Sequence, residues 1–169
     1  NFDDKLTVKS NEEEIESGAE FTVVYSETTI ELVVTPSQGY EFEFDATLLN
    51  GQITKNENRL IVNNLTNNGV LCISSLPADN TLNIEIDKVQ SVKAYVGEDE
   101  IEINDNKLIA KTESTVKVVF VAVKGYVFSN SSLNYSGSGN FTYEISADKQ
   151  TFTLTWVGFT AEASVIVKA

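Results

Sequence analysis

Two acidic clusters are the residues of this 169-residue chain whose type and spacing could do chemistry. Glu12-Glu13-Glu14 and Glu98-Asp99-Glu100 are each followed by Ile and Glu, so the same run occurs twice. Carboxylate oxygens are the ligands that calcium prefers in proteins. A loop that gathers them would bind this ion, and the candidate ligands are Glu12, Glu14, Glu98, Asp99 and Glu100.

A solvated strand surface is the alternative explanation of these carboxylates. Glu100 and Glu102 alternate with Ile101 and Ile103, as expected of a strand with one wet face. The spacing of Asp, Asn and Gly in an EF-hand loop is not found. We therefore favour the solvated strand and keep calcium as the alternative, and no other cofactor is indicated.

The catalytic side chains present in the sequence argue against an enzyme. The chain has no His, which excludes Ser-His-Asp and Cys-His arrangements and zinc sites that contain His. Cys72 is the one Cys and lies in an apolar run, where it is interpreted as a buried thiol. A carboxylate pair of glycosidase type remains, but no acidic residue lies in a setting that would raise its pKa. We predict a non-catalytic protein.

A segment rich in Tyr, Ser, Gly and Asn is a candidate for partner binding. Residues 129–140 have the composition of recognition loops, in which a rigid Tyr anchors the partner and small polar side chains adapt. Tyr135 is the predicted anchor, flanked by Asn134 and Ser136. The alternative is a solvated connection between two strands.

The net charge restricts the classes of partner. The chain has 12 Lys and Arg and 25 Asp and Glu, which gives a formal net charge of −13. Nucleic-acid binders need basic surfaces to displace counterions, and an anionic bilayer repels an acidic protein. No apolar run approaches the roughly 20 residues of a membrane-spanning helix. We expect neither nucleic acid nor membrane insertion.

The charge is also unevenly divided along the chain. Residues 1–87 have 16 acids and 4 bases, net −12, and residues 88–169 have 9 acids and 8 bases, net −1, which together give −13. Interfaces tolerate a near-neutral surface better than a strongly like-charged one. We expect the second part to dock against a larger protein assembly, with Lys117 and Lys124 at the contact.

An internal repeat organises the chain. A shift of 86 residues gives ten identities in the 36 pairs that begin at residue 7, against roughly two expected by chance. Further along, Ile84 and Ile86 match Val165 and Val167, which places the end of the first copy near residue 87. We predict two domains, an acidic one at 1–87 and a near-neutral one at 88–169.

Within each copy the apolar residues recur with a period of two. The segments 83–86, 100–103 and 151–156 alternate polar and apolar residues, which is typical of half-buried strands. Turn formers such as Asn50-Gly51 and Asn68-Gly69 separate the segments, and no helical pattern is present. The predicted fold class is all-β, with two tandem antiparallel immunoglobulin-like β-sandwich domains.

A repeated Gly-Tyr-x-Phe motif gives a resemblance to known proteins. Gly39-Tyr40-Glu41-Phe42 and Gly125-Tyr126-Val127-Phe128 resemble a hairpin of β-repeats in bacterial surface proteins, and the modules are similar to immunoglobulin-like modules on bacteriophage virions. The resemblance implies a structural or adhesive module, either an auxiliary or decoration protein of a bacteriophage capsid or a bacterial surface repeat. It also implies a protein partner in a capsid, tail or cell-surface scaffold, and a location on the virion or outside the cell.

The chain begins at Asn1 without an initiator Met. Removal of Met requires a small second residue, which Asn is not, so we expect residues upstream. A signal peptide, a processed pro-segment and residues left out of this sequence would look alike.

A carbohydrate-binding module is the alternative function. Aromatic side chains that are exposed in a line would stack on sugar rings, and calcium held by the acidic loops would assist. Trp156, Tyr40 and Tyr126 are interpreted first as core residues. If they are buried, the aromatic candidates that remain are Tyr25, Tyr95, Tyr135 and Tyr143.

Overall fold

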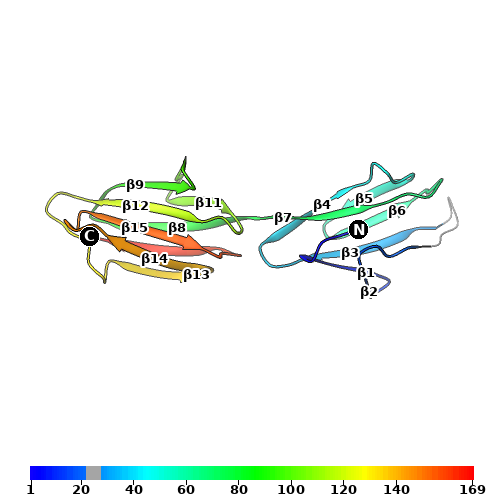
Figure 1. Cartoon of the computed structure of the whole chain (residues 1–169), viewed down its shortest axis with the longest axis horizontal. Helices are drawn as coiled ribbons and strands as arrows, with labels where there is room; N and C mark the ends of the chain where they lie inside the picture. Colours follow the sequence, from blue (N-terminus) through cyan, green and yellow to red (C-terminus); the bar gives the residue numbers. More distant parts are fainter. Residues whose placement is uncertain (22–27) are drawn as a thin grey trace. The chain divides into compact units, whose positions relative to one another are not determined.

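The computed structural model describes residues 1–21 and 28–169, and these residues form strands and turns without a helix. Contacts divide the chain into two compact units, Asn1–Leu76 and Pro77–Ala169 (Figure 1). The all-β class predicted from the period of two is confirmed, and the sheets are predominantly antiparallel. Because the described residues contain no helix, none of them belongs to a helix that spans a membrane.

The first unit, over residues 1–21 and 28–76, has a five-stranded sheet and a two-stranded sheet. The larger sheet has the order β2-β1-β3-β6-β5 with antiparallel pairs, and β4 pairs with β7 in the smaller sheet. The strands are β1 (Leu6–Ser10), β2 (Glu13–Ile15), β3 (Ile30–Pro36), β4 (Tyr40–Asp45), β5 (Gln52–Asn56), β6 (Arg59–Asn63) and β7 (Cys72–Pro77).

The second unit, all of whose residues are described, has a five-stranded sheet and a four-stranded sheet. Their orders are β10-β9-β12-β15-β14 and β11-β8-β16-β13. β8 and β16 run parallel, whereas the other pairs of this unit are antiparallel. The strands are β8 (Asp79–Asp87), β9 (Val89–Val96), β10 (Asp99–Ile101), β11 (Lys107–Lys111), β12 (Val116–Ala122), β13 (Leu133–Gly137), β14 (Asn140–Ile145), β15 (Thr151–Val157) and β16 (Ala163–Lys168).

The two five-stranded sheets are built alike. In each, a short hairpin, β1-β2 or β9-β10, lies beside a central strand, β3 or β12, and a second antiparallel pair follows on its other side. The central strands begin at Ile30 and Val116, which are separated by the 86 residues of the sequence repeat. The repeat is therefore present in the strand order as well as in the identities.

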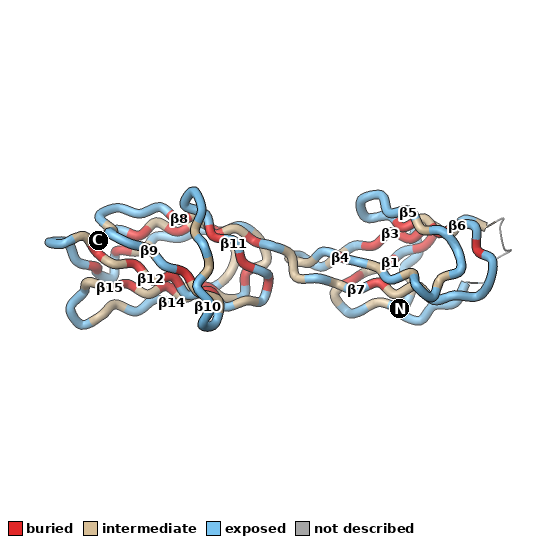
Figure 2. Tube along the Cα trace, turned by 90° about the horizontal axis from the view of Figure 1, so that it is seen from above, coloured by how far each residue is buried: buried red, intermediate tan, exposed pale blue. Residues whose placement is uncertain are grey.

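Alternating side chains build the core of each unit. In β15, Phe152, Leu154 and Trp156 are fully buried and the threonines between them are half-buried. Figure 2 shows the same recurrence of buried positions along other strands. Each large apolar side chain buried in this way contributes about 1.5–3 kcal/mol. In the second unit one cluster joins buried residues of both sheets, so the two sheets face each other around a single core.

The boundary between the units lies before β8, whereas the sequence predicted it near residue 87. The chain divides between Leu76 and Pro77 because β8 belongs to the four-stranded sheet of the second unit. In the parallel pair of β8 and β16, Ile84 lies opposite Val165 and Ile86 opposite Val167. The sequence match between these residues thus relates neighbouring strands of one sheet. Both strands line the same core, so both carry the same alternating pattern.

The Gly-Tyr-x-Phe motif forms the same turn in both units. Gly39 and Gly125 have φ values of 85° and 94°, which L side chains rarely adopt. The amides of Tyr40 and Tyr126 each donate a 3.0 Å hydrogen bond to the carbonyl three residues earlier. Beyond the turn the units differ, because β4 begins at once in the first unit whereas β13 begins only at Leu133 in the second.

The Asp3 carboxylate ties the start of the chain to β7. Its Oδ2 accepts a hydrogen bond of 2.8 Å from the Ser75 amide, and its Oδ1 accepts one of 3.0 Å from the Lys5 amide. The Ser75 hydrogen bond is the main cause that lowers the pKa of Asp3 below its ordinary value of 3.8. The carboxylate form is therefore favoured in the folded unit.

Acid is expected to weaken the first unit partly through Asp3. A carboxyl group with a lowered folded pKa contributes stability that is complete above its unfolded pKa and is lost as the pH falls through the folded pKa. Urea unfolding of the first unit, followed by NMR between about pH 5 and pH 2.5, should show this loss. Asp3→Asn should flatten that part of the profile by a small amount, because the group is exposed. An equally steep profile in the variant would contradict the assignment.

Candidate functional site

The first acidic cluster forms the turn of the β1-β2 hairpin. Ser10 pairs with Glu13, so Asn11 and Glu12 form a two-residue turn. Their φ values of 50° and 70° are those of the type I′ turn that suits the twist of a hairpin. Glu14 follows on the short strand β2 and is exposed. The cluster is therefore a hairpin tip in this unit.

The second acidic cluster occupies the equivalent hairpin of the second unit. Val96 pairs with Asp99, so Gly97 and Glu98 form the turn between β9 and β10. Gly97 has a φ of 63°, which Gly adopts without strain. Glu98, Asp99 and Glu100 are all exposed. The sequence repeat of acidic residues thus coincides with a repeated exposed hairpin.

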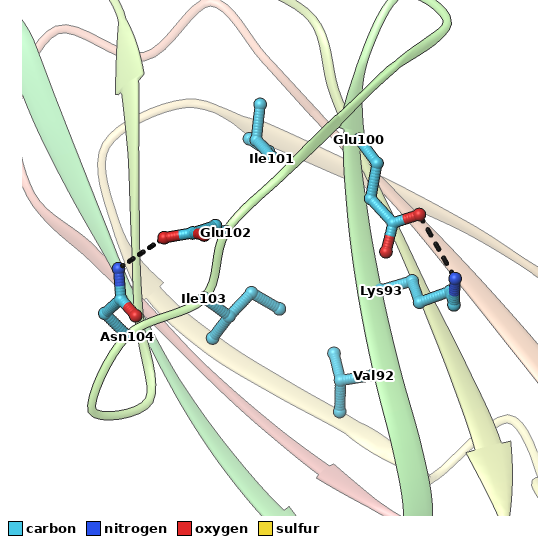
Figure 3. Close-up of a pocket in the computed structure, with 7 residues that line it drawn as sticks. All are labelled: Val92, Lys93, Glu100, Ile101, Glu102, Ile103 and Asn104. Atoms are coloured by element: carbon cyan, nitrogen blue, oxygen red, sulfur yellow. Dashed lines mark hydrogen bonds and ion pairs between the residues drawn. The ribbon is translucent and has the colours of Figure 1, made fainter.

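An open hollow of about 490 Å³ lies beside this hairpin (Figure 3). It is lined by Val92, Lys93, Glu100, Ile101, Glu102, Ile103 and Asn104. Lys93 Nζ donates to Glu100 at 3.1 Å, and this hydrogen bond raises the pKa of Lys93. Asn104 Nδ2 donates to Glu102 at 3.3 Å. Each carboxylate that lines the hollow therefore already has a donor of its own.

Calcium binding stays a prediction from the sequence. Within residues 1–21 and 28–169, no three Asp, Glu or Cys side chains are gathered closely enough to hold a metal ion. The five candidate ligands are divided between the two hairpins, with Glu12 and Glu14 in one and Glu98, Asp99 and Glu100 in the other.

The Tyr135 segment forms two strands in two different sheets. β13 pairs with β16 in the four-stranded sheet, and β14 pairs with β15 in the five-stranded sheet. Asn134, Tyr135 and Ser136 lie in β13, where alternation sends Tyr135 to the opposite face from its two neighbours. The three residues therefore lie on an edge strand, and Ser138-Gly139 connects this strand to the other sheet.

This connection, which we call the crossing, is defined by Gly137, Ser138 and Gly139. The Ser138 carbonyl accepts a hydrogen bond of 2.9 Å from Trp156 Nε1. Its Oγ accepts hydrogen bonds from the amides of Thr160, at 2.7 Å, and Ala161, at 3.1 Å. The crossing thereby satisfies the one polar atom of a fully buried indole.

Close packing explains the two glycines of the crossing. Gly137 and Gly139 have φ values of 103° and 92°. A Cβ at Gly137 would lie 2.6 Å from the Glu162 carbonyl oxygen, and a Cβ at Gly139 would lie 2.4 Å from Trp156 Nε1. Neither position has room for a side chain, so the glycines fix where β13 ends and β14 begins.

Tyr135, Phe141 and Tyr143 form a row that we call the aromatic strip. The ring centres of Tyr135 and Phe141 are 4.7 Å apart, so the strip bridges the edge strands of the two sheets. Phe141 stacks on Trp156 at 5.9 Å, and Tyr143 stacks on Phe152 at 5.1 Å. Tyr135 is 51% exposed and Tyr143 is 39% exposed. The strip is therefore a partly exposed aromatic surface held by buried rings.

The other predicted partner residues lie elsewhere on the second unit. Lys117 is exposed in the centre of the five-stranded sheet, where it pairs with Tyr95 and Thr155. Lys124 lies in the turn that precedes Gly125. The predicted partner residues thus fall in three places, and only Asn134, Tyr135 and Ser136 belong to one strand.

The aromatic candidates for sugar stacking differ in exposure. Trp156 is fully buried, as its interpretation as a core residue requires. Tyr40 and Tyr95 are half-buried, whereas Tyr126 is 42% exposed. Tyr25 lies outside the described residues. The described tyrosines with the most exposed side chains are therefore Tyr126, Tyr135 and Tyr143.

Phe141 was not identified from the sequence, and Ser138 was included only as one residue of the segment 129–140. Both act through Trp156, which is in a different strand, and no local spacing reveals that contact. The signal that was present is the pair of glycines around Ser138, since glycine inside strand-forming sequence indicates close backbone approach.

Comparison of the chain with family models, with curated proteins and with solved structures found no match.

Proposed function

We propose that the chain is a non-catalytic structural or adhesive module of a surface assembly, made of tandem immunoglobulin-like β-sandwich domains. The assembly we favour is a bacteriophage particle, on which the protein would be an auxiliary or decoration component. A bacterial surface protein is the other setting that agrees with the repeats and the acidity. In both, the partner is a protein of the capsid, tail or cell-surface scaffold.

The architecture supports this proposal. Each unit packs two sheets on one core, and the larger sheets of the two units share a strand order. Many cell-surface domains have this sandwich architecture. The near-neutral half predicted from the sequence contains the aromatic strip, and interface centres are depleted in charge and enriched in Tyr and Phe. The strip is the observation that carries the proposal.

The strip suits a protein partner for a physical reason. Tyr135 and Tyr143 already lie against other rings, so little side-chain entropy is lost when a partner covers them. β13 and β14 are edge strands of their sheets, with backbone groups available to a neighbouring strand. A partner segment laid along this side would contact aromatic rings and an unpaired strand edge together.

Loss of the two tyrosines is expected to weaken binding. Purified virions and the cell-envelope fraction of the source organism are the two probes, and cosedimentation with the full chain is the measurement. Tyr135→Ala and Tyr143→Ala should each reduce affinity at least tenfold, because truncating an aromatic anchor commonly costs about 2 kcal/mol or more. Tyr126→Ala is the matched control, since Tyr126 is similarly exposed and lies outside the strip.

The results of these binding measurements distinguish two possible docking surfaces on the second unit. If both strip variants bind as the unchanged chain does, the strip is not the docking surface. If Lys117→Glu and Lys124→Glu abolish binding instead, the partner lies on the outer face of the five-stranded sheet and its adjoining turn. Binding to neither probe would contradict the proposed function itself.

A carbohydrate-binding module remains the second candidate because of Tyr143. One face of its ring lies against Phe152 and the side chain stays partly exposed, which is the arrangement of an aromatic platform for a sugar ring. Glycan arrays with and without calcium test this function. Glycan binding that Tyr143→Ala abolishes would favour it over the protein partner.

A further inference from the structure

The smaller sheets of the two units differ in their number of strands. In the second unit β8 lies between β11 and β16, antiparallel to the first and parallel to the second. In the first unit, over residues 1–21 and 28–76, the smaller sheet contains β4 and β7 alone. A counterpart of β8 would lie along β7.

Asn1 already lies on the path of such a strand. Its amino group donates to the Leu71 carbonyl at 2.8 Å, and its own carbonyl accepts from the Ile73 amide at 2.7 Å. Two bonds from one residue to positions on either side of residue 72 are the pattern of parallel pairing. β8 pairs with β16 in this orientation, and its Asp87 carbonyl accepts from the Ala169 amide at 3.1 Å.

The residues that follow Asn1 take the route that β8 takes into β9. The Lys5 carbonyl accepts from the Ser37 amide at 2.7 Å, and the Lys88 carbonyl accepts from the Val123 amide at 2.9 Å. The same two Lys side chains lie over the repeated tyrosines, with Nζ 5.5 and 5.6 Å from the ring centres. Lys5 is thus the counterpart of Lys88.

The sequences on this route also correspond. Asn83-Ile84-Glu85 agrees with Asn1-Phe2-Asp3 in residue type, and each route ends in Asp-Lys, but the second route is longer by one residue, Ile86. Phe2 packs against the first core and Ile84 is buried in the second. In β8 the residue before Asn83 is Leu82, which is fully buried. The position before Asn1 therefore corresponds to a core position.

A hollow lies where that side chain would enter. Its apolar lining comes from Phe2, Val8, Ile15, Phe21, Leu32 and Ile73, of which several belong to the core of the first unit. Phe21 is 43% exposed. The hollow has a volume of about 50 Å³, so among residues 1–21 and 28–76 the first core is open beside Asn1.

We propose that the first unit is completed by a strand joined to Asn1, formed by residues immediately N-terminal to it in the polypeptide. The strand runs parallel to β7 and carries apolar side chains at alternate positions, with one directly before Asn1 that enters the hollow. We favour residues of the same polypeptide over a strand from another molecule because the hydrogen bonds of Asn1 to β7 already form the end of the strand. A strand from another molecule would have to stop at the Asn1 amino group.

The chain offers its own donor sequence for the test. The segment Asp79-Asn80-Thr81-Leu82 is fused directly before Asn1 of the full chain, which recreates the run that precedes Asn83. The matched control carries Leu82→Asp in the fused copy alone. Amide hydrogen exchange at Ile73 is the measurement, since this amide donates to Asn1.

The fused segment should slow exchange at Ile73 at least tenfold relative to both the unextended chain and the control. It should also raise the thermal midpoint of the first unit without moving that of the second. Equal protection by the two fused segments, or no protection, would overturn the proposal. A free peptide of residues 79–87 that protects Ile73 when the fused segment does not would overturn the covalent source.

Discussion

Gly139→Ala is expected to destabilise the second unit by roughly 2–4 kcal/mol, by combining backbone strain with the loss of a buried hydrogen bond. The residue has a φ of 92°, and a Cβ there would lie 2.4 Å from Trp156 Nε1. Either the indole or the crossing must move, so the bond from Trp156 to the Ser138 carbonyl is broken. Urea unfolding followed by the fluorescence of Trp156, the single Trp, measures the loss.

Gly125→Ala is the matched control for this substitution. Gly125 has a nearly equal φ of 94°, but a Cβ there would meet nothing within 4 Å. Gly125→Ala should therefore lower the free energy of unfolding only by the cost of the strained backbone, about 1 kcal/mol or slightly more. Equal losses in the two variants would show that the contact between Gly139 and Trp156 does not matter for stability.

Trp156→Ala is expected to cost about 3–5 kcal/mol, the range for truncating a large buried aromatic side chain. Trp156 is fully buried and stacks between Phe141, at 5.9 Å, and Phe159, at 3.9 Å. Its removal leaves a cavity and releases the aromatic strip from its support. Because this variant lacks the fluorescent residue, NMR signals of each unit during urea unfolding are the measurement.

Trp156→Phe separates packing from hydrogen bonding at this position. The Phe ring keeps much of the stack but cannot donate to the Ser138 carbonyl, so a loss of about 1–3 kcal/mol is expected. The first unit has its own core and should unfold as before in both variants. A shift in the transition of the first unit would contradict the independence of the two cores.

The fold class could be read from the sequence because strand burial is local. The alternation in residues 151–156 corresponds to β15, and the repeated Gly-Tyr-x-Phe corresponds to a repeated turn. The unit boundary could not be read in this way. Ile84 and Val165 lie in segments with the same alternating pattern because both face one core from adjacent strands. Such a pattern does not show whether two strands are neighbours in one sheet or corresponding strands of two repeats.

The candidate site was predictable only in part. Tyr135 stands out by composition, but its role depends on Phe141 and on Trp156, which pairing across β14 and β15 brings together. The acidic clusters stood out equally well in the sequence, and in the structure they form the tips of two hairpins. The spacing of the residues does not distinguish a Glu in a turn, such as Glu12 at its positive φ, from a Glu on an exposed strand. The pairing between strands shows which residues lie in a turn, on a strand or against a distant ring, and the sequence does not reveal this pairing.

The parallel pair of β8 and β16 has a mechanical consequence. These are the first and last strands of the second unit, and six residues of each lie opposite one another, from Leu82–Ala163 to Asp87–Lys168. Because the strands run in the same direction, a pull on the two ends of the unit slides one strand along the other. The hydrogen bonds between them are then loaded in shear and share the force, whereas a hairpin pulled at its open end would lose its bonds one by one. We therefore expect the pairing of β8 with β16 to resist such a pull more strongly than a hairpin of the same number of bonds would.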